Sequence, residues 1–416
     1  MRLLSFICGF ILCDAASAED WPRWRGVRGD GTWHAPTLPE KWPEAGLKQL
    51  WKRQIGGGYA GISVAGSYVL TMDRQKEPRE VERVLCFDAA TGRTHWTHEY
   101  ECKYGDLPYG SGPRAAPTID GDRVYTLGSL GHVCAFALET GKLIWSVNTI
   151  ARDNAKLPEW GFAASPVVWK NSLIIHVAAQ PGGCFQALDL TTGEELWRSG
   201  DDPAGYATPV LIDGPAGAQL LCWTPKHILG LEPDSGRVEW KIPYNVTYGV
   251  SIATPIYRDR LVFVAGYWEG SKAIKLGPKR TDAALAWEDK KDLRGLMSQP
   301  LYRDGLVYLL DKQYGITCFD LATGKKLWDD ENTLTPRGRN PHASLVWLGD
   351  SDRVIALNAE GELVLARFTR NGFHEQSRTK IIDFTWAHPA FAGNHVFARS
   401  DTEIVCVELP TESTSR

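Results

Sequence analysis

One turn recurs along this chain and constrains its fold more than any other feature. The turn has the pattern Asp-x-x-Thr-Gly, and a tryptophan stands four residues after the glycine. Five copies, some with substitutions before the glycine, keep this spacing: Gly92 to Trp96, Gly141 to Trp145, Gly193 to Trp197, Gly236 to Trp240 and Gly324 to Trp328. A constant pattern at such a period is typical of a repeat protein built from one supersecondary unit.

The turn itself predicts a β-hairpin. Asp and Thr side chains form hydrogen bonds with backbone groups in tight turns, and glycine adopts the positive φ that such turns need. An apolar segment precedes the turn, as in Val133–Leu138, and a short strand that carries the tryptophan follows it. We expect this large ring to seal one sheet against its neighbour.

A second mark lies a few tens of residues before each turn, where a proline follows a small or amide residue. The copies are Ala116-Pro117, Ser165-Pro166, Thr208-Pro209, Thr254-Pro255 and Gln299-Pro300. Proline is tolerated at the start of a strand because the ladder of hydrogen bonds has barely begun. A turn rich in Asp, Asn and Gly and then a β-rich run such as Arg123–Leu127 follow. The unit therefore contains four strands, which is one propeller blade.

The number of blades follows from the tryptophans, which recur every 41 to 52 residues from Trp51 to Trp328. Later units are irregular: Asn371-Gly372 is followed by Gln376 in place of tryptophan, and the last unit, from Trp386 to Val407, has only three strands. We expect the strand Leu47–Ile55 to supply the fourth. The sequence thus predicts an all-β fold, an eight-bladed β-propeller of four-stranded blades, closed by pairing the N-terminal strand with the last blade. A seven-bladed ring is the alternative.

The chain begins with features of a signal peptide. Arg2 precedes an apolar run, Leu3–Cys13, and Ala16-Ser17-Ala18 is a small-x-small cleavage site. We predict a signal peptide over 1–18, an N-terminal segment over 19–46, the propeller over 47–409 and a tail over 410–416. A lipoprotein would use Cys13, but Leu12 is bulky where a small residue is expected. We therefore expect a periplasmic or secreted protein, a monomer with no membrane span in the mature chain.

Charge and cysteine content exclude several classes of function. The formal net charge is −4 and the pI is about 6.2, so no nucleic-acid partner is expected. Seven cysteines follow residue 18, an odd number that argues against a complete disulfide framework. Five of them lie in apolar strand segments, as Cys86 does, and their spacing fits no zinc motif. We expect them to be small buried hydrophobic residues.

The pattern Ala/Phe-x-Asp-x-x-Thr-Gly-x-x-x-Trp resembles the repeat of the quinoprotein alcohol dehydrogenase-like propellers, known as the pyrroloquinoline quinone (PQQ)-like repeat. The resemblance covers residues 47–409, and the opening Asp20–Gly26 is also similar to that of exported propellers of this type. It implies the propeller architecture. It does not decide activity, because the family includes both PQQ-dependent dehydrogenases and non-catalytic members such as the barrel-assembly scaffold lipoprotein of outer membranes.

Catalysis would need more than the repeat. The resembling dehydrogenases use a carboxylate base, a calcium or lanthanide ion and often a pair of adjacent cysteines, but this chain has no Cys-Cys pair and no Cys-x-x-Cys-His for haem. We predict a non-catalytic binding or scaffold module with no cofactor. The alternative is a PQQ-dependent oxidoreductase, acting on an alcohol or sugar with PQQ and calcium. A polysaccharide hydrolase or lyase would need two close acidic side chains in the channel, and the sequence nominates none.

A candidate site follows from the propeller topology. The loops that enter the innermost strands cluster at one mouth of the channel, and the residues in them are unusually aromatic and basic. We predict ligand-binding roles for Tyr59, Arg114, Trp160, Tyr206, Tyr248, Arg339, His342, Trp386 and His388. Their neighbours in these loops are Tyr109, Phe162, Arg294, Met297 and Arg337. Such residues can hold a small anionic or carbohydrate-like ligand, or a peptide segment of a protein partner. Alternatively, they only fill the wedge-shaped channel. The test is whether Arg114, Arg339, His342 and His388 share one cavity.

Overall fold

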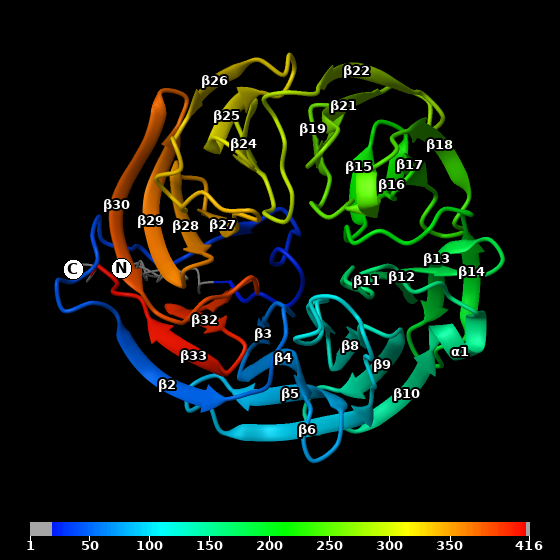
Figure 1. Cartoon of the computed structure of the whole chain (residues 1–416), viewed down its shortest axis with the longest axis horizontal. Helices are drawn as coiled ribbons and strands as arrows, with labels where there is room; N and C mark the ends of the chain where they lie inside the picture. The colour runs from blue at the N-terminus through cyan, green and yellow to red at the C-terminus, as the bar shows by residue number, and fades with distance from the viewer. Residues whose placement is uncertain (1–18, 413–416) are drawn as a thin grey trace, which may run out of the picture.

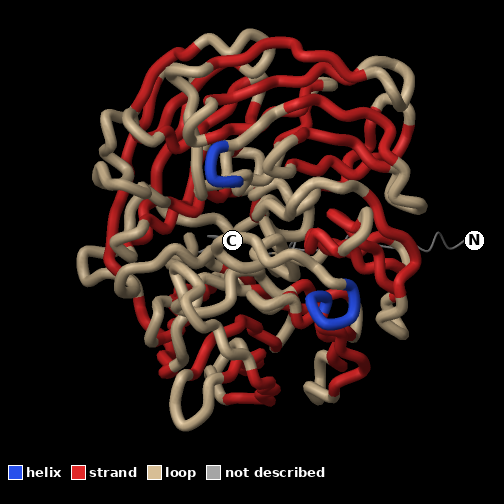
Figure 2. Tube along the Cα trace, turned by 45° about the vertical axis from the view of Figure 1, so that its right-hand side comes forward, coloured by secondary structure: helices blue, strands red, loops and turns tan. Residues whose placement is uncertain are grey.

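The computed structural model describes residues 19–412, in which eight β-sheets form a ring around a central axis (Figure 1). Within residues 19–412, only two short helical turns interrupt the strands and loops (Figure 2). The all-β, eight-bladed prediction is confirmed, and the seven-bladed alternative is wrong. The predicted signal peptide and the last four residues of the predicted tail lie outside the described residues. None of the helices in residues 19–412 has the length and apolar character that a membrane crossing requires.

Blades 1 to 4 follow one another along the chain, each running from the innermost to the outermost strand. Blade 1 contains β3 (Ser63–Ala65), β4 (Tyr68–Gln75), β5 (Val81–Asp88) and β6 (Thr94–Glu101). Blade 2 contains β7 (Thr118–Asp120), β8 (Arg123–Leu127), β9 (His132–Ala137) and β10 (Leu143–Asn148). Blade 3 contains β11 (Val167–Trp169), β12 (Ser172–Ala179), β13 (Gly183–Asp189) and β14 (Glu195–Ser199). Blade 4 contains β15 (Val210–Gly214), β16 (Gly217–Trp223), β17 (His227–Leu231) and β18 (Val238–Pro243).

Blades 5 to 8 complete the ring. Blade 5 contains β19 (Ile256–Arg258), β20 (Leu261–Gly266), β21 (Gly270–Leu276) and β22 (Ala283–Asp289). Blade 6 contains β23 (Leu301–Arg303), β24 (Leu306–Asp311), β25 (Gly315–Asp320) and β26 (Lys326–Asp329). Blade 7 contains β27 (Ala343–Leu348), β28 (Arg353–Asn358), β29 (Glu362–Thr369) and β30 (Gly372–Lys380). Blade 8 contains β31 (Ala390–Ala392), β32 (His395–Arg399), β33 (Glu403–Glu408) and β2 (Lys48–Gln54). The helical turns are α1 (Thr149–Asp153) and η1 (Thr247–Gly249).

The recurring turn interlocks neighbouring blades. The indole of Trp96 in blade 1 donates a hydrogen bond of 2.8 Å to Leu138 O, in the turn of blade 2. Gly141 in that turn packs so closely on the same ring that a Cβ there would lie 2.4 Å from it. Further bonds of this kind run from Trp51 to Ala89, Trp145 to Leu190, Trp197 to Pro233 and Trp287 to Leu321. The predicted sealing role of the tryptophan is therefore confirmed as a contact between blades.

Blades 5 and 7, in which the glycine–tryptophan turn is incomplete, show which contacts this turn normally makes. Blade 5 lacks the glycine turn, and the indole N–H of Trp240, which would reach it, is buried without a partner. The outer hairpin of each regular blade has a one-residue shift just before its tryptophan, and in blade 7 this shift leaves Gln376 unpaired and places Ser377 at the tryptophan position. The sequence assignment of Gln376 to that position is therefore wrong by one residue, because this hairpin stays paired as far as Gly372. Ser377 Oγ instead accepts the backbone N–H of the buried Trp42.

The ring closes as predicted. Strand β2, from the N-terminal part of the chain, pairs antiparallel with β33 from Lys48 opposite Glu408 to Gln54 opposite Glu403. Blade 8 therefore combines three C-terminal strands with one N-terminal strand, and β2 covers the edge that β33 would otherwise expose. Trp51 on β2 then continues the interlock into blade 1 through Ala89.

The N-terminal segment does not stay outside the propeller. It lies at the centre of the ring (Figure 1), where Trp21 pairs with Val64 of β3, Pro22 O accepts from Ile119 of β7, and β1 (Thr32–Trp33) adds to β27. Trp24 and Arg25 reach blades 5 and 6. The segment therefore joins the inner strands of most blades, an arrangement that the sequence analysis did not anticipate.

All seven cysteines in the described residues are free and buried, as expected. Burial raises the pKa of the Cys86 thiol to about 12, so little reactive thiolate forms at neutral pH. In protein expressed from Glu19, we expect Ellman's reagent to label none of them at pH 8 and all seven in guanidinium. Rapid labelling of the native protein would contradict the burial described here.

Candidate functional site

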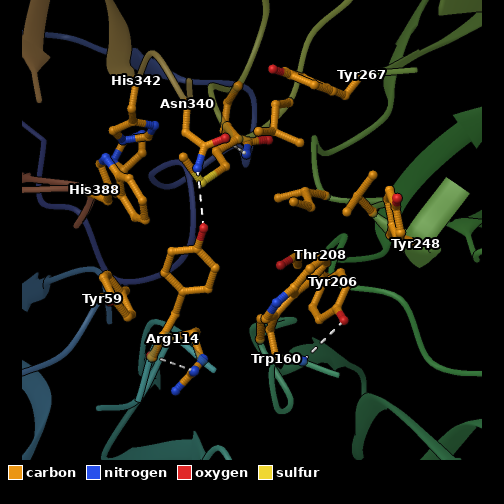
Figure 3. A pocket seen from close by; sticks show the side chains of 18 of the residues that line it. Tyr59, Arg114, Trp160, Tyr206, Thr208, Tyr248, Tyr267, Asn340, His342 and His388 are labelled. Carbon is orange, nitrogen blue, oxygen red and sulfur yellow. Dashed lines mark hydrogen bonds between the residues drawn. The ribbon is translucent and has the colours of Figure 1, made fainter. Parts of the chain in front are cut away.

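A cavity of about 360 Å³ lies at the mouth where the loops enter the inner strands, and we call it the cup. Its lining includes all nine residues that the sequence analysis selected. Arg114, Arg339, His342 and His388 therefore share one cavity, as the geometric test required. Figure 3 shows the labelled side chains gathered around this space from several blades. Their role in binding a ligand remains a prediction.

The neighbouring residues that the sequence placed in the same loops do not all line the cup. Tyr109 and Met297 also line the cup, whereas Phe162 is buried in the core of blades 2 and 3. Arg294 and Arg337 are not among the lining residues, and the Arg294 guanidinium instead bonds to Gln313. Position in a loop before an inner strand is thus a good guide to the cup, but it does not decide which way a side chain turns.

The lining has an unusual chemical balance. Nine of the side chains are tyrosine or tryptophan, two are arginine, and among the described residues no aspartate or glutamate contributes. The rings pack on one another: Tyr59 lies against Trp386 with centroids 5.7 Å apart, and Trp160 against Tyr206 at 5.4 Å. The cup therefore suits an apolar or aromatic group with a few uncharged or anionic polar atoms.

Arg114 positions one wall of the cup. Its guanidinium donates to Pro108 O at 3.1 Å, to Tyr109 O at 2.8 Å and to Ser129 Oγ at 3.0 Å, and it also bonds Gly112 O. Burial lowers the pKa of Arg114, and none of these acceptors is a carboxylate. The side chain therefore fixes the loop that carries Tyr109 and keeps its positive charge beside the cavity.

Two long loops meet across the mouth of the cup: the first carries Tyr109, and the second carries Arg339 and Asn340. Tyr109, held at a positive φ of 51°, accepts a long hydrogen bond of 3.5 Å from Asn340 Nδ2. Tyr267 donates to Arg339 O at 2.8 Å and so tethers the second loop to blade 5. Figure 3 shows the Asn340 bond spanning the cavity. These loops narrow the entrance from opposite sides.

His342 and His388 are two buried polar residues of the cup lining. Burial, with a smaller effect of the neighbouring His388, lowers the pKa of His342 to about 3. Burial also lowers the pKa of His388 to about 4, against a hydrogen bond to Pro389 O that raises it. Both imidazoles are therefore neutral at physiological pH, and the Nε2 atom of each is buried with no hydrogen-bond partner in the protein.

These lowered pKa values predict acid sensitivity. In the unfolded chain the imidazole takes up a proton below its ordinary pKa of about 6.5, whereas in the folded protein it does so only near pH 3 to 4. The free energy of unfolding is therefore unaffected by these histidines above pH 6.5 and falls as the pH drops towards 4. Each histidine contributes up to about 1.4 kcal/mol per pH unit in that window. We expect His342→Asn to flatten the fall in urea unfolding free energy between pH 6.5 and 4. An unchanged slope would mean that His342 protonates normally in the fold.

Trp24 completes the cup and was missed by the sequence analysis. Its indole N–H donates to Thr254 Oγ1 at 2.9 Å, and its ring meets His388 edge-on with centroids 5.1 Å apart. The residues after it, Arg25–Thr32 in part, line a second cavity of about 700 Å³ at the other end of the inner strands. The N-terminal segment therefore contributes residues to both cavities. The only sequence signal was the Trp-Pro-Arg-Trp opening, which does not reveal its docking place.

The cup does not fit a calcium-held quinone. Calcium takes carboxylate and carbonyl oxygens, and the quinoprotein mechanism adds a carboxylate base, but the described lining residues include no carboxylate. Within residues 19–412, no group of three or more His, Cys, Asp and Glu side chains is arranged to hold a metal ion. The pair of acids that a glycoside hydrolase or lyase would require is likewise missing from this lining.

Comparisons with known proteins agree with the fold. A BamB from Yersinia pestis, named as an outer membrane protein assembly factor, is 23% identical over 272 residues, which are 60% of this chain and 64% of that protein. The chain thus matches just under two thirds of that relative's length. The crystal structure of BamB from Moraxella catarrhalis superimposes with a TM-score of 0.63 at 16% identity, covering 88% of this chain and 99% of that one.

A quinohemoprotein alcohol dehydrogenase from Comamonas testosteroni superimposes with a TM-score of 0.67 at 14% identity, covering 95% of this chain and 82% of that one. At such identities, the likeness to either solved structure shows the fold alone. The sequence match is broader, because the family model described as outer membrane protein assembly factor BamB matches residues 48–241 and 186–416. The chain therefore belongs to the BamB family of PQQ-like repeat propellers.

Proposed function

We propose that this protein is an exported, periplasmic, non-catalytic propeller that binds a segment of a partner protein in the cup during outer membrane protein assembly. The process comes from the name of the family, and export from the signal-peptide features of residues 1–18. The cup supplies the chemistry, because its lining is rich in aromatic rings.

One observation favours a protein partner over a small ligand. Four large side chains around the mouth are between 45% and 67% exposed: Tyr109, Tyr248, Trp268 and Phe384. Three of them line the cup, and the fourth, Phe384, packs on the lining residue Trp386. A small ligand inside the cup would leave this aromatic rim in water, whereas a partner protein would cover it. Exposed aromatic residues around a central pocket are also the residue types that dominate binding energy at protein interfaces.

A binding experiment tests both whether the propeller binds a protein segment and whether it does so in the cup. An array of short overlapping peptides from outer membrane proteins is probed with the purified propeller, and fluorescence anisotropy gives the Kd of the best binders. We expect Trp160→Ala to weaken binding about 30-fold, as loss of a central anchor does. The control is Trp169→Ala, a tryptophan outside the cup whose indole bonds Asp234. Failure of every peptide to bind, or an equal loss in both variants, would exclude the proposed function.

The quinoprotein alternative is tested separately. Purified protein is incubated with PQQ and calcium, and the absorbance of the quinone is followed through gel filtration. Because the lining offers no carboxylate to calcium, we expect no stoichiometric co-elution. Co-elution with dye reduction by an alcohol or sugar would replace the binding-module proposal with a dehydrogenase.

A further inference from the structure

The charged side chains that line the cup are all positive. Arg114 and Arg339 line the cavity, and no aspartate or glutamate of the described residues does so. The two lining histidines are neutral at physiological pH because their pKa values are lowered to about 3 and 4. Arg114 donates only to carbonyl and hydroxyl oxygens. Arg339 is exposed, and its only hydrogen bond within residues 19–412 uses its backbone oxygen, which leaves the guanidinium without a partner there.

A third positive group lies beside the same mouth. Lys312 Nζ is 4.3 Å from the centroid of the Tyr267 ring and 4.5 Å from that of the Trp268 ring. Tyr267 also donates to Arg339 O at 2.8 Å, so Lys312 and Arg339 adjoin the same ring. Burial lowers the pKa of Lys312, and the neighbouring Arg294 lowers it as well. We call Tyr267, Trp268, Lys312 and Arg339 the cationic wall.

The carboxylates that act on these cations do not line the cavity. They are Asp311 and Glu269 beside Lys312, and Glu82 beside Arg114. Asp311 and Glu82 are fully buried, and Glu269 accepts a backbone N–H from η1. A group that enters the cup therefore meets cations at its surface, with the compensating carboxylates outside the lining.

The accessible polar atoms at the mouth include several hydrogen-bond donors. Tyr248 and Trp268 are exposed, and neither the phenol O–H of Tyr248 nor the indole N–H of Trp268 has a partner in the part of the chain that the structure describes. Asn340 Nδ2 has two hydrogens, and its one bond is the long contact with Tyr109. Together with the Arg339 guanidinium, these N–H and O–H groups suit an oxyanion, to which charge-assisted hydrogen bonds are strong.

We propose that the cup selects segments in which a carboxylate lies beside an aromatic side chain. The carboxylate binds at the cationic wall, and the aromatic side chain packs among the tyrosine and tryptophan rings of the lining. The inference rests on the proposed function and specifies which kind of segment enters. An acidic side chain and the C-terminus of a chain are two sources of the same anion.

The aromatic rings alone would favour the opposite charge, because the faces of tyrosine and tryptophan attract ammonium and guanidinium groups. Here some of these rings already contact cations of the protein itself: Lys312 lies over Tyr267 and Trp268, and the Arg114 guanidinium is 5.7 Å from the centroid of Tyr59. A lysine or arginine of an entering segment would meet like charges at these rings, which is unfavourable.

Three small probes that share one phenyl ring separate the possible charges. They are 3-phenylpropionate, 3-phenylpropionamide and 3-phenylpropylammonium, and ligand-observed NMR measures their affinities for the purified protein. We expect the carboxylate to bind about tenfold more tightly than the amide, and the ammonium to bind most weakly. The advantage of the carboxylate should shrink when NaCl is raised from about 0.05 M to about 0.5 M, because salt screens exposed charges.

Arginine variants test whether the preference arises at the cationic wall. Arg339→Gln should remove most of the preference for the carboxylate probe, and Arg339→Lys, which retains the charge, should keep most of it. Arg337→Gln is the matched control, since Arg337 is exposed in the same loop but does not line the cup. Neither arginine is buried, so these variants leave the core intact. An equal loss in Arg337→Gln and Arg339→Gln would contradict a site at this wall.

The best array peptide then distinguishes the two sources of the carboxylate. Its acidic residues are replaced by asparagine or glutamine in one version, and its C-terminus is amidated in another; we expect one change to weaken binding about tenfold. If neither does, if the carboxylate and amide probes bind equally, or if the ammonium binds best, the inference fails while the proposed function stands. If no array peptide binds, the proposed function fails, and a carboxylate preference among the probes would then describe a site for small acids instead.

Discussion

Replacing Gly141 with alanine is expected to destabilise the propeller by about 3 kcal/mol. Two costs add. The residue has a φ of 67°, where an L-residue with a side chain costs about 1–2 kcal/mol. The new Cβ would also lie 2.4 Å from the Trp96 ring, and overpacking of this kind costs about 1–3 kcal/mol. Because Trp96 also bonds to the same turn, the blades cannot simply move apart. Urea unfolding followed by tryptophan fluorescence measures the change.

Gly121 provides a matched control for this experiment. It has a positive φ of 56°, but no heavy atom lies within 4 Å of the position of a Cβ there. Gly121→Ala should therefore cost only the backbone part, about 1 kcal/mol. Equal losses in the two variants would show that the blade contact adds nothing, and the repeat would then specify turn conformation rather than blade packing.

The repeat made most of the fold predictable because each copy encodes one local hairpin and one contact with the next blade. Five matching turns and five prolines were enough to set the blade length, and the missing strand of blade 8 led directly to β2. Prediction was weaker where a copy had degenerated. In blade 7 nothing in Asn371–Gln376 reveals that the hairpin pairs one residue further, so the tryptophan position was misplaced.

The cup was predictable in part for the same topological reason. Loops that enter inner strands must converge at one mouth, and this was sufficient to find Arg114, His342 and His388. Tyr267 and Trp268 were missed because they lie in the turn between β20 and β21, which returns to that same mouth. Trp24 was missed for another reason: a non-repeating segment finds its place through contacts with many blades, and no local pattern encodes them.

Two tryptophans of the N-terminal segment are expected to have opposite roles, although both are largely enclosed by other blades. Trp33 is fully buried, stacks on Phe391 at 4.8 Å and donates to Glu19 O, but does not line the cup. Trp33→Ala should cost about 3–5 kcal/mol of stability and leave peptide affinity unchanged in the folded protein. Trp24 forms part of the cup beside His388, and Trp24→Ala removes this ring from the lining. It should weaken peptide binding about 30-fold, a loss of about 2 kcal/mol.

Measuring stability and peptide affinity in both variants distinguishes a role in binding from a role in folding. Urea unfolding gives stability, and anisotropy titration of the best array peptide, under conditions where each variant is folded, gives affinity. If the N-terminal segment served only to fill the channel, both substitutions would lower stability and neither would change the Kd. A selective loss of affinity in Trp24→Ala would instead make Trp24 part of the binding site, so that a segment which the repeat does not encode contributes to binding.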